Sequence, residues 1–459
     1  MKTYNVAIVG GGPGGYVAAI RAAKEGQTVA LIEADQLGGT CLNRGCIPSK
    51  TLLRHAEVIE DIRSAKKWGI ETGELTFSLE KMMARKDQVI QTLRTGIASL
   101  LKAGKVDVFQ GWGTVQADKT IRIEGKESTV IQADSIILAT GSVPFVPPIS
   151  GTDAVSYYTS DTIFGISEIP ESIAIIGGGV IGVEFACIFE SLGTKVTVVE
   201  MANRLVPNED PDASTVLLKT LKKKGIRVFT DTKVEAVGTR PNGKAVQITD
   251  ANGVMQELAI SELLIAVGRR PNLAAIAELN LTMNGPFVAV NEYMETSSKG
   301  IYAVGDLIGG WQLAHVASAE GIVAALNASG HRTAMDYKVV PRCIYTLPEI
   351  ASVGLTEEEA RKQGYRVKVD VYRHSANGKS IAMDQKDGFV KLIADETYGE
   401  ILGVVLVGPH VTEMISTPSA FIHLEGTVEE MANMIFPHPT VSETMFEMAA
   451  KWLGTGIHS

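Results

Sequence analysis

Two cysteines, Cys41 and Cys46, lie five positions apart in the glycine-rich segment GGTCLNRGCIPSK, residues 38–50. Two thiols at this spacing can form a redox-active disulfide, bind a metal ion or remain as inert buried thiols. A zinc site would need further cysteine or histidine ligands at short spacing, and none are near. Gly45 would relieve the strain of a short disulfide-bonded loop, and a helix that begins near Cys46 would favour its thiolate. A redox disulfide is therefore the favoured interpretation, with Lys50 adding positive charge on the same helix face.

A histidine near the C-terminus, His438, lies between Pro437 and Pro439, and Glu443 follows just before a predicted helix that runs to about Leu453. A carboxylate at this spacing can accept a hydrogen bond from the imidazole, orient the ring and raise its basicity. Thiol–disulfide exchange needs a base that deprotonates the incoming dithiol. Because a lone histidine is more often structural, the residues alone leave both roles open for His438.

The elements that must position these groups are visible as an internal repeat. Residues 6–33 read VAIVGGGPGGYVAAIRAAKEGQTVALIE, and residues 173–200 read IAIIGGGVIGVEFACIFESLGTKVTVVE. Each copy has a β-branched run, a Gly-x-Gly-x-x-Gly turn, an amphipathic helix, a second β-branched run and an acid. This order is the βαβ fingerprint of dinucleotide-binding folds. Its positions are Gly10, Gly12, Gly15 and Glu33 in the first copy and Gly177, Gly179, Gly182 and Glu200 in the second.

Each part of the fingerprint has a physical task. The first glycine permits a tight turn, the second lets the backbone approach a pyrophosphate, and the third lets the helix pack close to the strand. The helix N-terminus offers free N–H groups to the phosphates, and the final acid can bind a ribose 2′-hydroxyl. The chain is therefore predicted to bind two dinucleotides. Because Glu200 would repel a 2′-phosphate, NAD is favoured over NADP in the second copy, although Arg204 nearby could weaken that preference.

The remaining sequence indicates the order of the domains. Long solvent-exposed helices are expected between Ala56 and Leu101, and Asp306 is expected at the carboxyl end of a strand, where open α/β sheets bind ligands. We predict an α/β fold with two Rossmann-like dinucleotide-binding domains followed by a C-terminal α+β domain. The predicted boundaries are 1–146 for the first domain, 147–270 for the second, 271–336 for a segment that returns to the first, and 337–459 for the third.

Composition excludes several classes of protein. The chain has 459 residues and a formal net charge of −9, which argues against nucleic acid as a partner. Pro13 and its neighbouring glycines interrupt the N-terminal apolar run, and the apolar run at residues 173–187 is too short to cross a bilayer. We therefore predict a cytoplasmic protein without membrane insertion. Cys187 and Cys343 stand alone in apolar or strand-like stretches and are expected to be buried packing residues.

Taken together, these motifs resemble those of the FAD-dependent pyridine nucleotide–disulfide oxidoreductases, and the resemblance covers essentially the whole chain. It implies FAD on the first domain, NAD on the second, and a C-terminal dimerisation domain. The motifs that carry it are the two glycine fingerprints, the Cys41–Cys46 segment with Pro48-Ser49-Lys50, Ala139-Thr140-Gly141, Val304-Gly305-Asp306, and His438 with Glu443.

The resemblance also implies roles for single residues. Cys41 would exchange disulfides with the substrate, and Cys46 would contact the flavin. Lys50 would lie near the flavin and pair with Glu184. His438, oriented by Glu443, would be an acid–base residue supplied by the other subunit of a homodimer. Further cofactor contacts would come from Thr40, Gly141, Gly268, Asp306 and Ala314.

Within this family the resemblance is greatest to the members that oxidise dihydrolipoamide on the lipoyl domain of an acyltransferase or carrier protein. An NAD(P)H-dependent glutathione-type reductase is the alternative enzyme, although such reductases use arginines where this chain has Glu200. A flavoprotein that binds both cofactors without turnover is the contrasting class. The presence of Cys41, Cys46, His438 and Glu443 together argues against it, because a pure binding protein has no use for all four.

Overall fold

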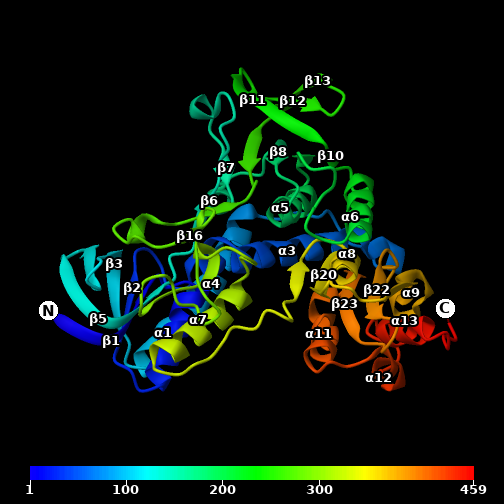
Figure 1. The fold of residues 1–459 in the computed structure, drawn as a ribbon. Helices are drawn as coiled ribbons and strands as arrows, with labels where there is room; N and C mark the ends of the chain where they lie inside the picture. Colours follow the sequence, from blue (N-terminus) through cyan, green and yellow to red (C-terminus); the bar gives the residue numbers. More distant parts are fainter. Residues whose placement is uncertain (459) are drawn as a thin grey trace.

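The computed structural model describes residues 1–458 as three parts of one molecule (Figure 1). The first dinucleotide module lies at the lower left of Figure 1, the second module forms the upper part, and the third, C-terminal module lies at the lower right. Helix α3 (Cys46–Ser64) runs through the middle between them. The predicted α/β fold with a C-terminal α+β domain is confirmed. The exact domain boundaries given above are not tested by these observations and are kept as predictions.

The first module is built around a six-stranded sheet. Strand β1 pairs in parallel with β2 and β5, and β18 adds to the sheet beside β5. Because β18 follows the second module in sequence, the chain leaves the first module and then returns to complete its sheet. Helices α1 and α7 pack against each other and against β5. The bounds are β1 (Lys2–Val9), α1 (Pro13–Lys24), β2 (Val29–Glu33), β3 (Asp107–Val115), β4 (Thr120–Gly125), β5 (Thr129–Leu138), β18 (Ile301–Ala303) and α7 (Ala314–Ala328).

The second module has a five-stranded parallel sheet in the order β10-β9-β8-β14-β7 and a three-stranded antiparallel sheet β11-β12-β13 at the top of Figure 1. The segments that join it to the first module, β6 and β15, pair with each other, so the two crossings of the chain lie side by side. The bounds are β6 (Ser142–Pro144), β7 (Tyr158–Thr159), β8 (Ser172–Ile176), α5 (Val180–Ser191), β9 (Lys195–Val199), α6 (Pro211–Lys223), β10 (Arg227–Phe229), β11 (Thr232–Arg240), β12 (Gly243–Asp250), β13 (Met255–Ile260), β14 (Glu262–Ile265) and β15 (Arg269–Pro271).

The helices expected between Ala56 and Leu101 are present, as two separate helices. Helix α3 ends at Ser64 and is followed by a short 3-10 turn, and α4 (Leu79–Ala103) begins after a segment without helix or strand. Ser78 caps α4 by accepting a hydrogen bond from the backbone N–H of Lys81. None of the helices within residues 1–458 is both long enough and apolar enough to cross a bilayer.

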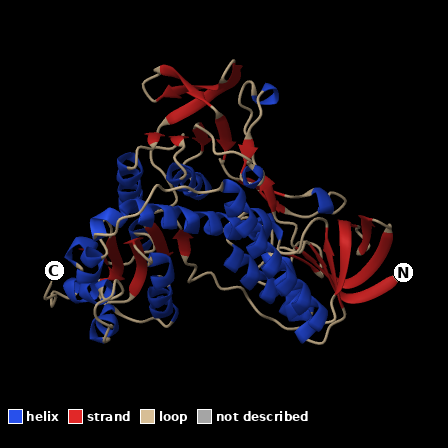
Figure 2. Cartoon of the chain, turned by 180° about the vertical axis from the view of Figure 1, so that it is seen from behind, coloured by secondary structure: helices blue, strands red, loops and turns tan. Residues whose placement is uncertain are grey.

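The third module is a five-stranded antiparallel sheet in the order β19-β20-β23-β22-β21, which helices flank in Figure 2. Helices α8 and α12 are each preceded by an N-cap threonine with a glutamate three residues after it, and both form the reciprocal hydrogen bonds of a capping box. The bounds are β19 (Arg342–Ile344), β20 (Glu349–Gly354), α8 (Glu357–Lys362), β21 (Val367–Arg373), α9 (Gly378–Ala382), β22 (Phe389–Asp395), β23 (Ile401–Gly408), α10 (Val411–Met414), α11 (Ser416–His423), α12 (Val428–Asn433) and α13 (Thr444–Trp452).

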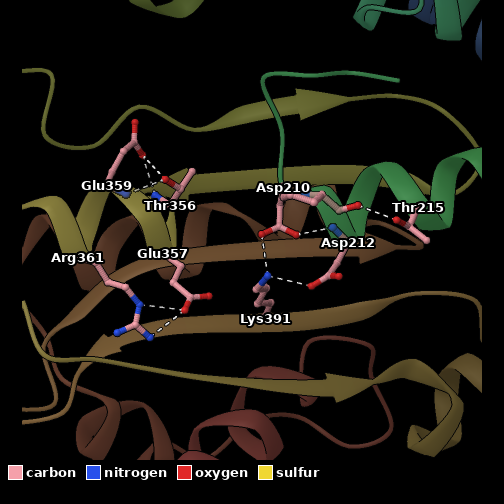
Figure 3. Close-up of polar contacts among 9 residues, drawn as sticks. Asp210, Asp212, Thr215, Thr356, Glu357, Glu359, Arg361 and Lys391 are labelled. Carbon is pink, nitrogen blue, oxygen red and sulfur yellow. Dashed lines mark hydrogen bonds and ion pairs between the residues drawn. The ribbon is translucent and has the colours of Figure 1, made fainter. Parts of the chain in front are cut away.

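A buried polar cluster fastens the second module to the third. The Lys391 ammonium on β22 lies 2.8 Å from Asp210 and 2.9 Å from Asp212 at the start of α6 (Figure 3). Next to them, Glu209 is 3.0 Å from the Arg342 guanidinium on β19. The cluster therefore anchors the loop that connects Glu200, at the end of the second fingerprint, to the start of α6. Figure 3 also shows the capping pair of α8, Thr356 and Glu359, and the ion pair of Glu357 with Arg361.

His374 makes the third module sensitive to acid. Its side chain is completely buried, and a Cβ atom at Gly408 would lie 2.5 Å from the ring. Burial lowers the pKa of His374 from 6.5 to about 4. Because folding disfavours the protonated ring, its contribution to stability is complete above the unfolded pKa and is lost as the pH falls toward the folded one. The whole shift corresponds to ~3 kcal/mol.

We therefore expect the apparent unfolding temperature to fall between about pH 7 and about pH 4, and more steeply than in a His374→Leu variant, which cannot titrate. Calorimetric scans of both proteins across this range isolate the histidine, because all other titrating groups are shared. Parallel pH dependences in the two proteins would contradict this assignment.

Candidate active site

The two fingerprint turns have the same backbone geometry. The first glycines, Gly10 and Gly177, have φ angles of 106° and 107°, in the left-handed region that favours glycine. A Cβ atom at Gly15 would lie 1.8 Å from the carbonyl oxygen of Gly10, and one at Gly182 would lie 1.9 Å from that of Gly177. The third glycine of each turn is therefore required for the helix to approach the turn.

The second glycines, Gly12 and Gly179, lie at the N-caps of α1 and α5, and neither helix has a side-chain cap. The free backbone N–H groups of the first turn are therefore available to an anionic ligand, and in α1 they begin at Gly14 because Pro13 has none. At Gly179, a Cβ atom would have no neighbour within 4 Å, so this turn offers room for a ligand to approach the backbone.

The acids at the ends of the second strands are held in equivalent ways. Glu33 accepts a hydrogen bond from the backbone N–H of Gly11 at 2.6 Å, and Glu200 accepts one from that of Gly178 at 2.6 Å. Each carboxylate accepts a second bond from the backbone two residues further along, at 2.7 Å and 2.6 Å respectively. Each carboxylate is thus fixed beside its turn, with acceptor capacity left for a ribose hydroxyl.

One continuous cavity of about 2020 Å³ connects both turns with the two cysteines. His438 and Glu443 do not line it, and Gly15 and Gly182 lie behind the turns. All other predicted site residues line this cavity: Gly10, Gly12, Glu33, Thr40, Cys41, Cys46, Lys50, Gly141, Gly177, Gly179, Glu184, Glu200, Gly268, Asp306 and Ala314.

Cys41 and Cys46 are free thiols close enough to share a hydrogen bond. Cys41 is in the short helix α2 (Gly39–Arg44), and Cys46 is the first residue of α3. The hydrogen bond from Cys41, reinforced by the Lys50 ammonium, lowers the pKa of Cys46 to about 7 despite its burial. The same hydrogen bond, together with burial, raises the pKa of Cys41 well above its usual range. In this dithiol the thiolate is therefore Cys46, at a helix N-terminus that stabilises negative charge.

Lys50 connects the cysteine helix to the second module. Its ammonium lies 2.9 Å from both carboxylate oxygens of Glu184, which is on α5 and only 4% exposed. The backbone N–H of Tyr345 also donates to Glu184, at 3.1 Å, and the Tyr345 ring centroid is 4.5 Å from the ammonium. The Lys50–Glu184 pair that the sequence resemblance implies is thus present.

His438 and Glu443 form a hydrogen-bonded pair on the third module. Nδ1 of His438 lies 2.8 Å from Oε2 of Glu443, which immediately precedes α13. The His438 side chain is 79% exposed and that of Glu443 is 15% exposed. Since neither residue lines the cavity of Cys41 and Cys46, a single chain does not bring this pair to the cysteines.

Comparison with known families identifies the scaffold. The model of the pyridine nucleotide-disulphide oxidoreductases matches residues 4–321, and the model of the dimerisation domain of the same proteins matches residues 340–449. The chain belongs to this family. Residues 340–449 are therefore a dimerisation domain, and the family is FAD-dependent.

Individual relatives of this family match along their whole length. The chain is 43% identical to a dihydrolipoyl dehydrogenase of Bacillus subtilis (strain 168), with 99% of each protein covered. A dihydrolipoyl dehydrogenase of Chlamydia muridarum (strain MoPn / Nigg) is 40% identical, covering 100% of this chain and 98% of the relative.

Solved structures of the family have the same architecture. The structure of LpdA from Mycobacterium tuberculosis has a TM-score of 0.89 at 27% identity, with 98% and 99% of the two chains covered. The Cu(II) complex of the HOCl-induced flavoprotein disulfide reductase RclA from Escherichia coli has a TM-score of 0.88 at 29% identity, with 98% and 100% covered. Because proteins with different names share this fold, the fold does not select the substrate.

The first module fits the FAD that the family uses. The uncapped N-terminus of α1 suits a pyrophosphate, and Glu33 beside the turn suits a ribose hydroxyl. Asp306, at the carboxyl end of β18, lines the same cavity and accepts a hydrogen bond from Ser142 at 2.5 Å. These residues belong to the sheet edge at which open α/β folds bind ligands.

Arg269 is a site residue that the sequence did not single out. Its guanidinium donates to Ser142 Oγ at 2.7 Å and to Asp161 at 2.7 Å, and lies 3.4 Å from Thr40 Oγ1. Through Ser142 it is connected to Asp306. Arg269 therefore links Thr40 of the first module with Asp161 of the second, beside the paired strands β6 and β15. The only sequence signal was the Arg-Arg-Pro-Asn run directly after a predicted strand.

The prediction for one of the two remaining cysteines was wrong. Cys187 is buried as expected, but Cys343 is only half-buried and lines the large cavity. It is on β19, a three-residue strand that runs along the cavity wall, so packing protects only part of its side chain. Burial nevertheless raises the pKa of Cys343 to about 11, which keeps it protonated and unreactive at neutral pH.

Proposed function

We propose that this protein is a dihydrolipoyl dehydrogenase that oxidises dihydrolipoamide, carried on the lipoyl domain of an acyltransferase or carrier protein, and reduces NAD⁺. The observation that supports it most directly is the dithiol of Cys41 and Cys46, placed in one cavity with two dinucleotide turns. The full-length identity of 43% to a dihydrolipoyl dehydrogenase favours this dithiol over other thiol or disulfide substrates.

In the proposed reaction, the enzyme starts with a disulfide between Cys41 and Cys46. His438 accepts a proton from one substrate thiol, and the resulting thiolate attacks the sulfur of Cys41. The Cys41–Cys46 bond breaks, and Cys46 leaves as the thiolate, the form that its lowered pKa favours. The second substrate sulfur then displaces Cys41, and its proton passes to the leaving Cys41 sulfur. Lipoamide is released, and the enzyme holds the Cys41 thiol, the Cys46 thiolate and a protonated His438. Two electrons have moved from substrate to enzyme.

The two cofactors complete the proposed cycle. Bound FAD supplies the two-electron chemistry that links the dithiol to nicotinamide. The protein's own residues hold the reacting groups in place, since Lys50 and Glu184 connect the cysteine helix with α5 of the second module. The Lys50 charge also stabilises the Cys46 thiolate that remains after substrate release.

We propose that the functional unit is a homodimer in which the partner subunit's His438 serves each active site. Two observations support this arrangement. Residues 340–449 match a dimerisation domain, and His438 does not line the cysteine cavity of its own chain. A cytoplasmic location remains a prediction from the sequence.

The second module is proposed to select NAD over NADP through Glu200. Its carboxylate is fixed beside the turn, and the guanidinium of Arg204 is directed to the carbonyl of Pro207, at 2.7 Å. We expect Glu200→Gln to lower kcat/KM for NAD⁺ by about 10- to 100-fold, the effect of losing one hydrogen bond to a charged group. The same change should narrow the preference for NAD⁺ over NADP⁺, because a repelling charge is removed. Initial rates with both nucleotides measure the two effects.

The matched control is Glu33→Gln, the equivalent substitution in the first turn. It should lower the FAD content of the purified protein and leave the ratio of NAD⁺ to NADP⁺ rates unchanged. If Glu200→Gln also leaves this ratio unchanged, Glu200 is not the selecting residue.

The experiment that tests the function is an assay of the purified FAD-loaded protein. Dihydrolipoamide with NAD⁺ is expected to give rapid NADH formation, and NADP⁺ much less. Turnover of glutathione disulfide with NADPH, without dihydrolipoamide activity, would instead identify a glutathione-type reductase. If FAD-loaded protein is inactive in every assay, a binding role without turnover is the better explanation.

A further inference from the structure

A buried asparagine on the third module holds the carboxylate that orients His438. Asn377 is 3% exposed and caps the N-terminus of α9. Its Oδ1 accepts hydrogen bonds from the backbone N–H and the hydroxyl of Ser380, at 2.8 and 2.9 Å. Its Nδ2 donates to the carbonyl of Thr440 and to Oε1 of Glu443, both at 3.0 Å. All four hydrogen-bonding positions of the amide are therefore used.

These bonds fix which way the amide faces. Because the backbone N–H of Ser380 can only donate, Oδ1 must face α9. The Thr440 carbonyl and the Glu443 carboxylate can only accept, so Nδ2 must face them. The two oxygens of the Glu443 carboxylate thus have separate partners, Asn377 on Oε1 and His438 on Oε2. The bond to Thr440 also fastens the segment between His438 and Glu443.

The chemical character of the donor matters for a base. A lysine or arginine in place of Asn377 would neutralise Glu443 and weaken its attraction for an imidazolium. A neutral amide orients the carboxylate and leaves its negative charge facing the histidine. The other titratable groups near Glu443 are Tyr372 on β21, Glu447 on α13 and His458, whose ring lies 2.8 Å from Glu447.

We propose that Asn377 is a positioning residue for the acid–base chemistry of His438, acting through Glu443. The inference rests on the proposed function, in which His438 accepts the proton of the substrate thiol. It gives this role to the N-cap residue of α9, which is more than sixty positions away from the histidine in sequence.

Asn377→Asp separates this role from helix capping. Aspartate keeps the acceptor that caps α9, but it cannot donate to Glu443 or Thr440 and it places a second negative charge beside Glu443. We expect kcat for dihydrolipoamide oxidation to fall about tenfold or more. FAD content and the rate of ferricyanide reduction by NADH should stay unchanged, because that reaction needs no proton transfer from a thiol. A variant as active as the wild type in the dithiol assay would overturn the proposal.

Asn377→Leu and Asn327→Leu form a matched pair. Asn327 makes equivalent side-chain bonds to backbone groups of Tyr293 and Thr333 in the first module, away from His438. Only Asn377→Leu should reduce dihydrolipoamide oxidation selectively. Equal losses in both variants, or a loss that ferricyanide reduction shares, would show a general structural effect and refute the positioning role.

A readout that needs no substrate keeps this test independent of the proposed function. The rate at which diethyl pyrocarbonate modifies His438 at a fixed pH, followed by peptide mass analysis, reports how the ring nitrogens are presented. We expect this rate to fall about two- to fivefold in Asn377→Leu, because a loosely held Glu443 no longer keeps the N–H on Nδ1 and leaves Nε2 as the free nucleophile. An unchanged rate contradicts the proposal even if the wild type proves to act on another substrate.

Discussion

Replacing Cys46 with serine is expected to lower dihydrolipoamide-dependent NADH formation by about a thousandfold or more. The substitution leaves the size of the side chain almost unchanged, and it removes the sulfur that must form and release the disulfide with Cys41. A serine hydroxyl cannot form a disulfide with Cys41, so the substrate has no enzyme disulfide to reduce and thiol–disulfide exchange cannot take place. Steady-state assays with and without dihydrolipoamide measure the loss, and ferricyanide reduction by NADH shows that the cofactor sites remain intact.

Cys343→Ser is the control for this result. It removes another thiol from the same cavity, but one that burial keeps protonated, so activity should change less than about twofold.

The lowered pKa of Cys46 gives a second test of the cysteine assignment, the pH dependence of its alkylation. Alkylation of the reduced wild type by iodoacetamide should increase with pH around an inflection near about 7 and be lost in Cys46→Ser. Dihydrolipoamide oxidation that survives Cys46→Ser would refute the cysteine assignment.

The dinucleotide turns could be predicted from sequence because every determinant is local. In each copy the glycines, the helix and the acid lie within one short window, residues 6–33 and 173–200. The positive φ angles of Gly10 and Gly177 and the close helix contact at Gly15 then follow from spacing alone. The place of Cys46 at a helix start was predictable for the same reason.

Contacts between distant residues could not be predicted in this way. Arg269 meets Ser142 and Thr40 only after the chain has left the first module and returned, and a single sequence carries no sign of that meeting. The half-exposure of Cys343 depends on where β19 lies along the cavity wall, which strand propensity does not determine. The position of the break between α3 and α4 was not predicted, although Gly69 and Gly73 lie within it. Long-range packing, rather than local preference, decided the contacts of Arg269 and the exposure of Cys343.

The position of His438 leads to the second large effect. His438→Ala is expected to lower kcat for dihydrolipoamide oxidation by about 100- to 10,000-fold, the usual contribution of a general acid–base group. Ferricyanide reduction by NADH should be unaffected. The loss should be partly recovered at high pH, where the substrate thiol ionises without help from a base.

Hybrid dimers test which subunit supplies this histidine. Chains carrying Cys46→Ser and chains carrying His438→Ala, each inactive as a homodimer, are co-expressed with different tags and purified through both. If the histidine acts across the interface, each hybrid has one site with intact cysteines and an intact histidine, and activity per dimer should reach about half that of the wild type. If it acts within its own chain, both sites of every hybrid stay defective. Inactive hybrids would therefore contradict a role for His438 across the interface. The histidine would then be structural or would act on its own subunit's cysteines, whose cavity it does not line in the folded chain.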